Sequence, residues 1–372
     1  MDYDKLKEDF RDLALLNESK EPLLTCYLNN DSNERDYREG LDLRIQEIRR
    51  TLPENQRLSF EESLAKIEAY LVSEFSIKSK GVAIFVRSGE ESFFKAISFD
   101  IAFETSFSVD SVPQLYQLVL MKDTYHRYVL LITEESHARI VEVSVGTITQ
   151  ELWTSKPELR ESSGRGWTKE HYQNHKQDRE NKFIKEKIKV LDKLFTDGKH
   201  SHLIIAGNRS NVARVKAKLP KRLLAHLIDN IQFGGDVLTE DIVRASLPKY
   251  ADFEQLESID KAAFLLEEVN RGGLAVTATA QSLKALQKGQ VDLLILSENY
   301  HPPKAWKCLD CQYTAIGEKT CACEACGSKN LIDTNLKEEM IRLAELMSSD
   351  IEILRNSDAL LEIRGVGCLL RY

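Results

Sequence analysis

The sequence contains no run of roughly eighteen apolar residues, the length that a membrane-spanning helix needs. Its first ten residues, MDYDKLKEDF, are charged where a secretory signal peptide would be apolar. The phosphate-binding pattern GxxxxGKS or GxxxxGKT is absent, and so are HExxH and GxSxG. These absences argue against a membrane protein, a GTPase and the common metalloproteases and hydrolases. They predict a cytoplasmic chain.

Composition describes an ordinary globular protein that is too long for one compact core. The chain has 372 residues, of which 42% are hydrophobic and 30% are charged, and its net charge is -8. This length suits two or three domains. A chain with a net negative charge does not bind polyanions through its overall charge, so any contact with nucleic acid has to come from a local group of cations.

Five of the seven cysteines crowd into nineteen residues, which is the spacing of a ligand cluster and not of a disulfide framework. Cys308 and Cys311 form one CxxC pair, and Cys323 and Cys326 form a second pair after eleven intervening residues. Four thiolates at this spacing can surround one zinc ion and leave no open position for water. The pattern predicts a structural zinc site, with Cys321 as a spare thiol that could compete as a ligand.

Helical and strand patterns alternate along the chain, which predicts an α/β fold. We expect three α/β domains at residues 1–122, 123–235 and 236–372, the third with a zinc-ribbon insert at 304–330. The third domain is expected to open with two separate helices, at about Glu240–Ala245 and Ile259–Asn270. Residues 128–143 read as two strands joined by a turn, so Glu134, Glu135 and His137 are interpreted as hairpin residues and not as an acid/base site.

The stretch from Arg160 to Phe195 combines an exposed tip with a long helix. Ile184, Ile188, Leu191 and Phe195 recur at helical spacing and would face a core, whereas Tyr172 is the only large apolar residue between Thr168 and Lys182. The first part of this helix must therefore project into solvent or onto a partner. Before it stands Gly164-Arg165-Gly166-Trp167, where two glycines free the backbone around one cation and one indole.

Charge in this stretch is opposite in sign to that of the whole chain. From Arg165 to Lys193, nine cations outnumber five acids. A basic, aromatic-tipped projection on an acidic body favours docking to phosphate. The alternative is a solvated helix with intrahelical pairs such as Glu186 and Lys189. The sequence alone leaves both interpretations open.

Histidines in and after this helix are weaker candidates for a site. His171 and His175 stand at i and i+4, a spacing that can hold a metal, but the sequence places no acidic third ligand beside them. Partly protonated histidines on a phosphate-binding helix are the favoured interpretation. His200 and His202 flank the start of a strand and are expected to be residues at its edge.

Three segments resemble the archaeo-eukaryotic class-I release factors and Pelota. The run Gly164-Arg165-Gly166 before a long polar-to-amphipathic helix is similar to the GRGGQ loop and helix of the middle domain. The segment Gln281–Leu286, with Gly289 and Val291–Leu296 after it, is similar to the helix and strand of the C-terminal domain. The ending Arg364–Tyr372, RGVGCLLRY, resembles its glycine-rich terminus. Trp167 and Thr168 stand where that family has the last glycine and glutamine of GGQ, and the NIKS stop-codon motif is absent.

The resemblance implies a factor that occupies the ribosomal A site. In the family, the GGQ backbone helps admit water to the ester of peptidyl-tRNA. Trp167 adds a β-carbon and a bulky ring and Thr168 is β-branched, so the tip is expected to have lost the reaction. With such a tip, the chain resembles the Balon-type ribosome hibernation factors, and this resemblance implies no enzymatic activity.

The same resemblance implies the partners of the chain. These are the bacterial ribosome with its large-subunit rRNA and P-site tRNA, and elongation factor Tu or a related translational GTPase, with neither membrane nor DNA. Two other classes stay open, a rescue or peptide-release factor with an altered tip and a non-ribosomal RNA-binding protein. The residues expected on rRNA are Arg165, Gly166, Trp167, Thr168, Lys169, His171, Lys176 and Arg179.

Overall fold

The computed structural model describes residues 3–19, 21–30, 37–76, 79–135, 137–155, 169–196, 200–234, 237–355 and 365–372. The chain folds into two compact units. Unit 1 consists of residues 1–3 and 125–253, and unit 2 consists of residues 4–124 and 254–372. Within the described residues, no helix is both long enough and apolar enough to cross a membrane.

Unit 1 is a three-layer structure around a five-stranded sheet. The strand order is β7-β6-β5-β8-β9, in which β5, β8 and β9 are parallel and β6 and β7 are antiparallel to their neighbours. The strands are β5 (Tyr128–Thr133), β6 (His137–Ser144), β7 (Thr147–Ser155), β8 (Leu203–Gly207) and β9 (Leu227–Gln232). The central strands β5 and β8 are buried along their whole length, as expected for a sheet covered on both faces.

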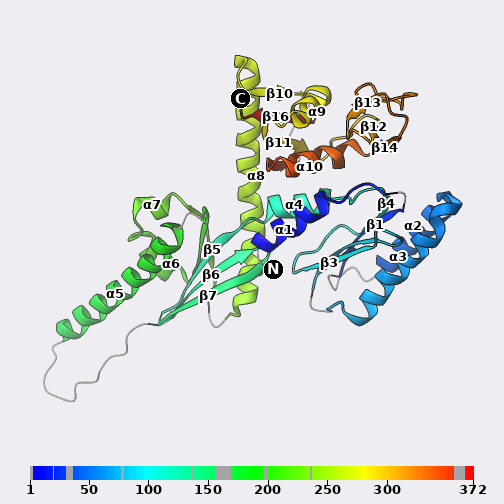
Figure 1. Cartoon of the computed structure of the whole chain (residues 1–372). Coiled ribbons are helices and arrows are strands. Elements are labelled where there is room, and N and C mark those ends of the chain that lie inside the picture. Colours follow the sequence, from blue (N-terminus) through cyan, green and yellow to red (C-terminus); the bar gives the residue numbers. More distant parts are fainter. Residues whose placement is uncertain are drawn as a thin grey trace. The chain divides into compact units, whose positions relative to one another are not determined.

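Helices cover both faces of this sheet. One face packs against α5 (Lys169–Thr196), α6 (Arg209–Lys216) and α7 (Lys221–Leu224). Figure 1 shows these three helices in green, beside the strands. The other face packs against Ile242, Val243 and Tyr250 from the first part of α8 (Thr239–Arg271).

The prediction of two helices in this region is wrong, because α8 is continuous and contains Pro248. A proline inside a helix lacks one backbone hydrogen bond and costs about 3 kcal/mol. Packing around it offsets that cost. The ring of Tyr250 stacks on that of Tyr128 at 4.5 Å, and the hydroxyls of Tyr128 and Ser246 lie 2.5 Å apart.

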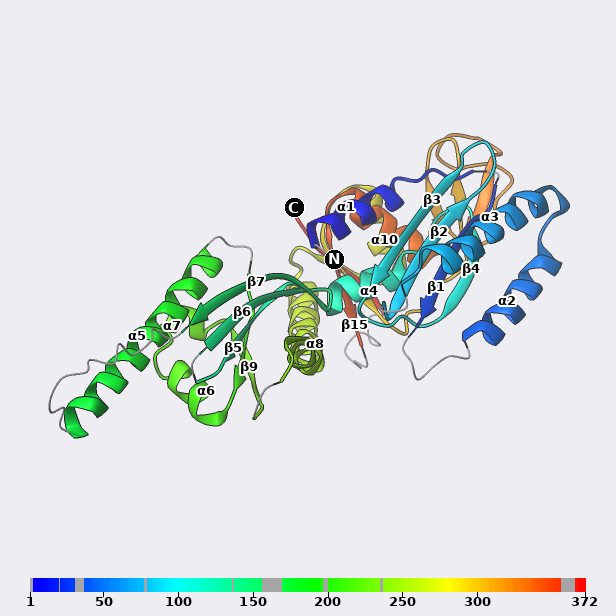
Figure 2. The same ribbon diagram turned by 90° about the horizontal axis from the view of Figure 1, so that it is seen from below.

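Unit 2 contains the N-terminal sheet and two further sheets from the C-terminal third of the chain. The N-terminal sheet is antiparallel with the order β3-β2-β1-β4. Helices α2 and α3 pack on one face of it, and Figure 2 shows both in blue beside this sheet. The elements are α1 (Tyr3–Ala14), β1 (Leu23–Asn29), α2 (Tyr37–Thr51), α3 (Glu54–Ser73), β2 (Gly81–Arg87), β3 (Phe93–Phe99), β4 (Ser106–Asp110) and α4 (Tyr116–Thr124).

The second sheet of unit 2 has the order β10-β16-β11-β15, with β11 and β15 parallel. Ala262 and Leu265 of α8 pack against this sheet. Helices α9 and α10 contact β16 and β15, respectively. The elements are β10 (Ala275–Thr277), α9 (Thr279–Gln287), β11 (Val291–Ser297), α10 (Leu336–Leu346), β15 (Asp350–Leu354) and β16 (Val366–Leu370).

A small three-stranded sheet interrupts this domain where the cysteine-rich insert was expected. Its order is β13-β12-β14, with β12 (Ala305–Cys308), β13 (Thr314–Ile316) and β14 (Leu331–Thr334). The structure thus confirms a mixed α/β fold with a cysteine-bearing insert. The division into three domains stays a prediction, since residues 4–124 and 254–372 form one compact unit.

Candidate functional site: the cysteine cluster and the long helix

Four cysteine sulfurs converge at one end of the small sheet. Cys308 ends β12, Cys311 lies in the turn that follows, and Cys323 and Cys326 come from the loop before β14. All four ligand atoms lie within 4.8 Å of one another. The Sγ atoms of Cys308 and Cys326 are 3.6 Å apart, and so are those of Cys311 and Cys323.

These distances suit a metal site and not disulfides. A tetrahedral zinc ion with Zn–S bonds of about 2.3 Å would separate its sulfurs by about 3.8 Å, whereas a disulfide bond is about 2.05 Å long. All seven cysteines are free thiols. Cys321 is exposed and is not part of the four-sulfur cluster. The sequence therefore identified four cysteines that the fold brings to metal-binding distance.

A buried apolar core and a buried ion-pair network adjoin the cysteine cluster. Trp306, Cys308 and Cys323 are buried together, and the rings of Trp306 and Tyr313 meet edge to face at 6.1 Å. Between Trp306 and Cys308, Lys307 forms ion pairs with Glu18 and Glu339. Sequence spacing gave no sign of this network, because Glu18 and Lys307 lie 289 residues apart.

The long helix α5 exists as expected and begins at Lys169, directly after the GRGWT run. The buried apolar side chains in the described part of α5 are Phe183, Ile184, Leu191 and Phe195. Arg165, Gly166, Trp167 and Thr168 lie outside the described residues. For Lys169, His171, His175 and Lys176 only the helical backbone is described. Arg179 is half-buried.

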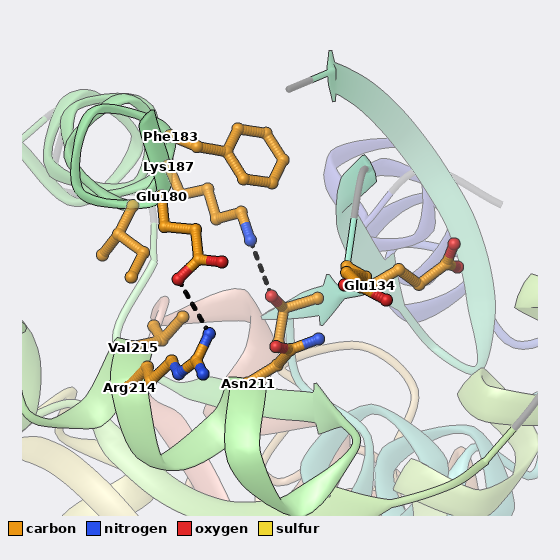
Figure 3. Close-up of a pocket in the computed structure, with 10 residues that line it drawn as sticks. Glu134, Glu180, Phe183, Lys187, Asn211, Arg214 and Val215 are labelled. Carbon is orange, nitrogen blue, oxygen red and sulfur yellow. Dashed lines mark hydrogen bonds and ion pairs between the residues drawn. The ribbon is translucent and has the colours of Figure 1, made fainter. Parts of the chain in front are cut away.

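Two polar contacts fix α5 beside a small pocket at the carboxyl end of β5. The buried Lys187 donates from Nζ to Oγ1 of Thr133 at 2.7 Å, and its ammonium lies 4.0 Å from the centre of the Phe183 ring. Glu180 pairs with Arg214 of α6 at 3.0 Å. Figure 3 shows Lys187 beside the Phe183 ring and the Glu180–Arg214 pair below it. These contacts attach α5 to the sheet and to α6 over about two turns of helix.

The hairpin interpretation of Glu134, Glu135 and His137 is confirmed. The backbone N–H of Glu134 donates to the carbonyl of His137 at 3.0 Å, and the Glu134 carboxylate pairs with Arg139. His200 and His202 flank the start of β8, as expected. His200 is buried, and its Nε2 lies 3.0 Å from Oε2 of Glu142, so it belongs to the packed interior near β6.

The middle of the chain matches a known protein family. Residues 113–248 match the sequence model of the family described as bacterial archaeo-eukaryotic release factor family 10. This part of the chain is therefore similar to a release-factor family. The match contains the whole described part of α5, the pocket and β5 to β9. The resemblance to archaeo-eukaryotic release factors is therefore confirmed for this part of the chain.

One curated relative and two solved structures are similar to the chain as follows. Peptide chain release factor subunit 1 of Pyrococcus abyssi is 26% identical over 175 residues, which span 42% of this chain and 42% of that protein. Pelota of Archaeoglobus fulgidus is 14% identical with a TM-score of 0.37, covering 78% of this chain and 79% of that one. Dom34 of S. cerevisiae, a translation termination-like factor, is 12% identical with a TM-score of 0.39, covering 80% and 81%.

Proposed function

We propose that this protein is a ribosome-binding translation factor that occupies the A site and extends its tip toward the peptidyl-transferase centre without releasing the peptide. The carrying observation is the arrangement of α5. The helix is anchored from Glu180 onward by Arg214, Phe183 and Lys187, and it begins eleven residues earlier at the end of the GRGWT run. A rigid support under a basic, aromatic tip suits contact with structured RNA.

The residues at the tip are the reason for proposing that the protein does not release the peptide. Trp167 and Thr168 replace a glycine and a glutamine at the positions where the related factors need tight backbone geometry and an amide. A bound factor that blocks the A site and leaves peptidyl-tRNA intact would protect idle ribosomes. Ribosome hibernation, as in the Balon-type factors, is the role that fits best. It would take place in the cytoplasm, with delivery by elongation factor Tu or a related GTPase.

A peptide-release or rescue factor is the second candidate. The observation that favours it is the 26% identity to a peptide chain release factor over 175 residues. The two candidates share the ribosomal site and differ in whether the peptidyl ester is cleaved. A release assay therefore separates them.

We further propose that the cysteine cluster holds one structural zinc ion through Cys308, Cys311, Cys323 and Cys326. Sulfur spacing near that of a zinc tetrahedron and the soft thiolate donor set support this assignment. With four protein ligands, zinc would stabilise the insert and would have no position for a reacting water. The cation would also offset the repulsion of four thiolates brought within 4.8 Å.

Ribosome co-sedimentation over a range of salt concentrations tests the proposed contact of α5 and its tip. In one variant, Arg165, Lys169, Lys176 and Arg179 are all replaced by alanine. Affinity should fall, and the salt dependence should flatten by about one unit for each lost phosphate contact. The control removes the same charge from exposed lysines of unit 2, at Lys284, Lys288, Lys319 and Lys329. Equal binding by the wild type and the first variant would contradict the proposal.

A further inference from the structure

Unit 1 carries a second basic segment, separate from the tip. Residues 208–226 contain six cations and no acid, in a chain whose net charge is -8. The cations are Arg209, Arg214 and Lys216 on α6, Lys218 in the following turn, and Lys221 and Arg222 on α7. We call this set the α6–α7 basic surface.

The side chains of this surface are accessible. Lys216 is half-buried and the other five are exposed. Arg214 and Arg222 keep 53% and 49% of their side chains exposed although each forms an ion pair. Arg209, Lys216 and Lys221 form no ion pair with any acid in the described part of the chain. Their charge is therefore free to act on a partner.

The backbone under the surface is fixed by packing on the same sheet that supports α5. Val212, Val215 and Leu223 are buried in the core between these helices and the sheet. Two acids of α5 pair with the arginines, Glu180 with Arg214 at 3.0 Å and Asp192 with Arg222 at 2.6 Å. Helices α6 and α7 thus lie alongside α5, as Figure 1 also shows, and their cations add to those of α5.

We propose that the α6–α7 basic surface binds the phosphate backbone of RNA, as a second contact beside the tip. The inference rests on the proposed ribosomal function and adds to it the position of another rRNA contact. The six cations come from a segment without acids, and within the described part of the chain only Arg214 and Arg222 of these six pair with acids, both on α5. Such a set of cations matches a run of phosphates. Residues 208–226 contain no Phe, Tyr or Trp, so the contact reads backbone charge and does not stack on bases.

A protein partner fits this surface less well. Protein interfaces have an apolar core and are depleted in lysine. Within residues 208–226, all of which are described, Leu224 is the exposed large apolar side chain. The surface therefore lacks the apolar centre around which a protein interface would form.

Replacing Arg209, Lys216 and Lys221 by alanine tests the proposal in the full-length protein. These three residues leave the Arg214 and Arg222 pairs in place, so the fold should persist, as circular dichroism can verify. Affinity is measured for purified bacterial ribosomes and for deproteinised rRNA between about 50 and 200 mM salt. For the wild type, Kd should rise between the lower and the higher salt concentration. For the variant, which has lost three phosphate contacts, this rise should be smaller by a factor of about 20 to 40. The control replaces Arg244 and Lys249, exposed cations of α8 in the same unit, by alanine and should change little.

The outcomes separate this inference from the proposed function. If the wild type fails to bind ribosomes, the proposed function is wrong, and the titration with rRNA still decides the role of the surface. If the triple variant binds rRNA and ribosomes with unchanged affinity and salt dependence, the inference is overturned. It is also overturned if the variant loses only the binding of a translational GTPase, since the surface would then dock a protein.

Discussion

Lys307 and Glu339 form an ion pair in which each side chain is 1% exposed, with 3.2 Å between Nζ and Oε1. Glu18 also pairs with Lys307, and Arg342 pairs with Glu339 at 2.8 Å. Glu18 follows α1, Lys307 is in β12, and Glu339 and Arg342 are in α10. The network therefore joins the N-terminal segment, the cysteine-bearing insert and the second sheet's helix within unit 2.

Removing the lysine should strongly destabilise unit 2. Lys307→Met leaves the Glu18 and Glu339 carboxylates buried with less compensating charge, and breaking a buried pair in this way costs about 3–5 kcal/mol. Urea unfolding measures the loss. The control is Lys304→Met, which breaks a shorter pair with Glu318 at 2.7 Å whose side chains are 79% and 80% exposed, and which should change stability little. Equal effects of the two substitutions would refute the assignment of the network.

The buried carboxyl group of Glu338 should make the stability of unit 2 depend on pH. Its carboxylate accepts hydrogen bonds from the backbone N–H groups of Leu115 and Tyr116 at 2.6 and 3.2 Å, at the start of α4. Burial raises the pKa of Glu338 from 4.5 to about 7, against those hydrogen bonds and Lys337, which lower it, while Asp110 raises it further. Between these two pKa values the folded state binds more protons than the unfolded state. The free energy of unfolding should therefore fall as pH rises through this window, by up to about 3 kcal/mol.

Glu338→Gln should flatten this dependence, because the amide keeps an acceptor oxygen for Leu115 and carries no charge. The readout is the midpoint of thermal unfolding as a function of pH. An exposed substitution, Glu318→Gln, serves as control and should leave the pH dependence of the wild type in place. A wild-type profile that is flat between pH 4.5 and 7 would show that the Glu338 pKa is not raised.

Zinc content tests the cysteine cluster. Protein purified without chelator should contain about one zinc per chain, since four thiolates fill one tetrahedron. Cys323→Ser should release the metal and unfold the insert. The matched control, Cys321→Ser, changes an exposed thiol outside the cluster and should keep the zinc. Elemental analysis that finds no zinc in the wild type, or loss of zinc in the control variant, would refute the ligand assignment.

Peptide release tests the altered tip. Ribosomes carrying a labelled initiator peptide on P-site tRNA should keep the label when the purified protein is added, because Trp167 and Thr168 do not supply the GGQ geometry. Trp167→Ala should weaken ribosome binding by about 1–3 kcal/mol with little change in salt dependence, as expected for a lost stacking contact. Release at the rate of an active release factor would instead make this protein an enzyme.

Periodic apolar patterns were sufficient to predict most of the elements. The stretch between 246 and 258 was not predicted as helix, because its buried positions are mostly polar. Its buried positions are Ser246, Tyr250, Glu254 and Ser258, and an apolar pattern does not reveal the two serines and the glutamate. The hydroxyl of Ser246 donates to the carbonyl of Val243 at 2.7 Å, which satisfies it inside the core.

Sites whose residues lie close together in the sequence could be predicted, and sites whose residues lie far apart could not. The spacing of the two CxxC pairs is enough to predict a metal site, and the structure brings all four sulfurs together. The Lys307 network and the Glu338 contact with α4 join residues more than 200 positions apart, so only the tertiary fold reveals them. The residues of the α6–α7 basic surface form a sequence segment without acids, but the sequence does not show that its cations face outward. The structure shows this, because Val212, Val215 and Leu223 are buried and leave the cations on the outside.

A density map of the full-length protein on bacterial ribosomes that carry P-site peptidyl-tRNA tests the central claim most directly. The account predicts density in the A site, with Trp167 near the peptidyl-transferase centre, the α6–α7 basic surface on rRNA and the peptidyl ester intact. Deacylated tRNA in the P site, or protein bound outside the A site, would contradict it.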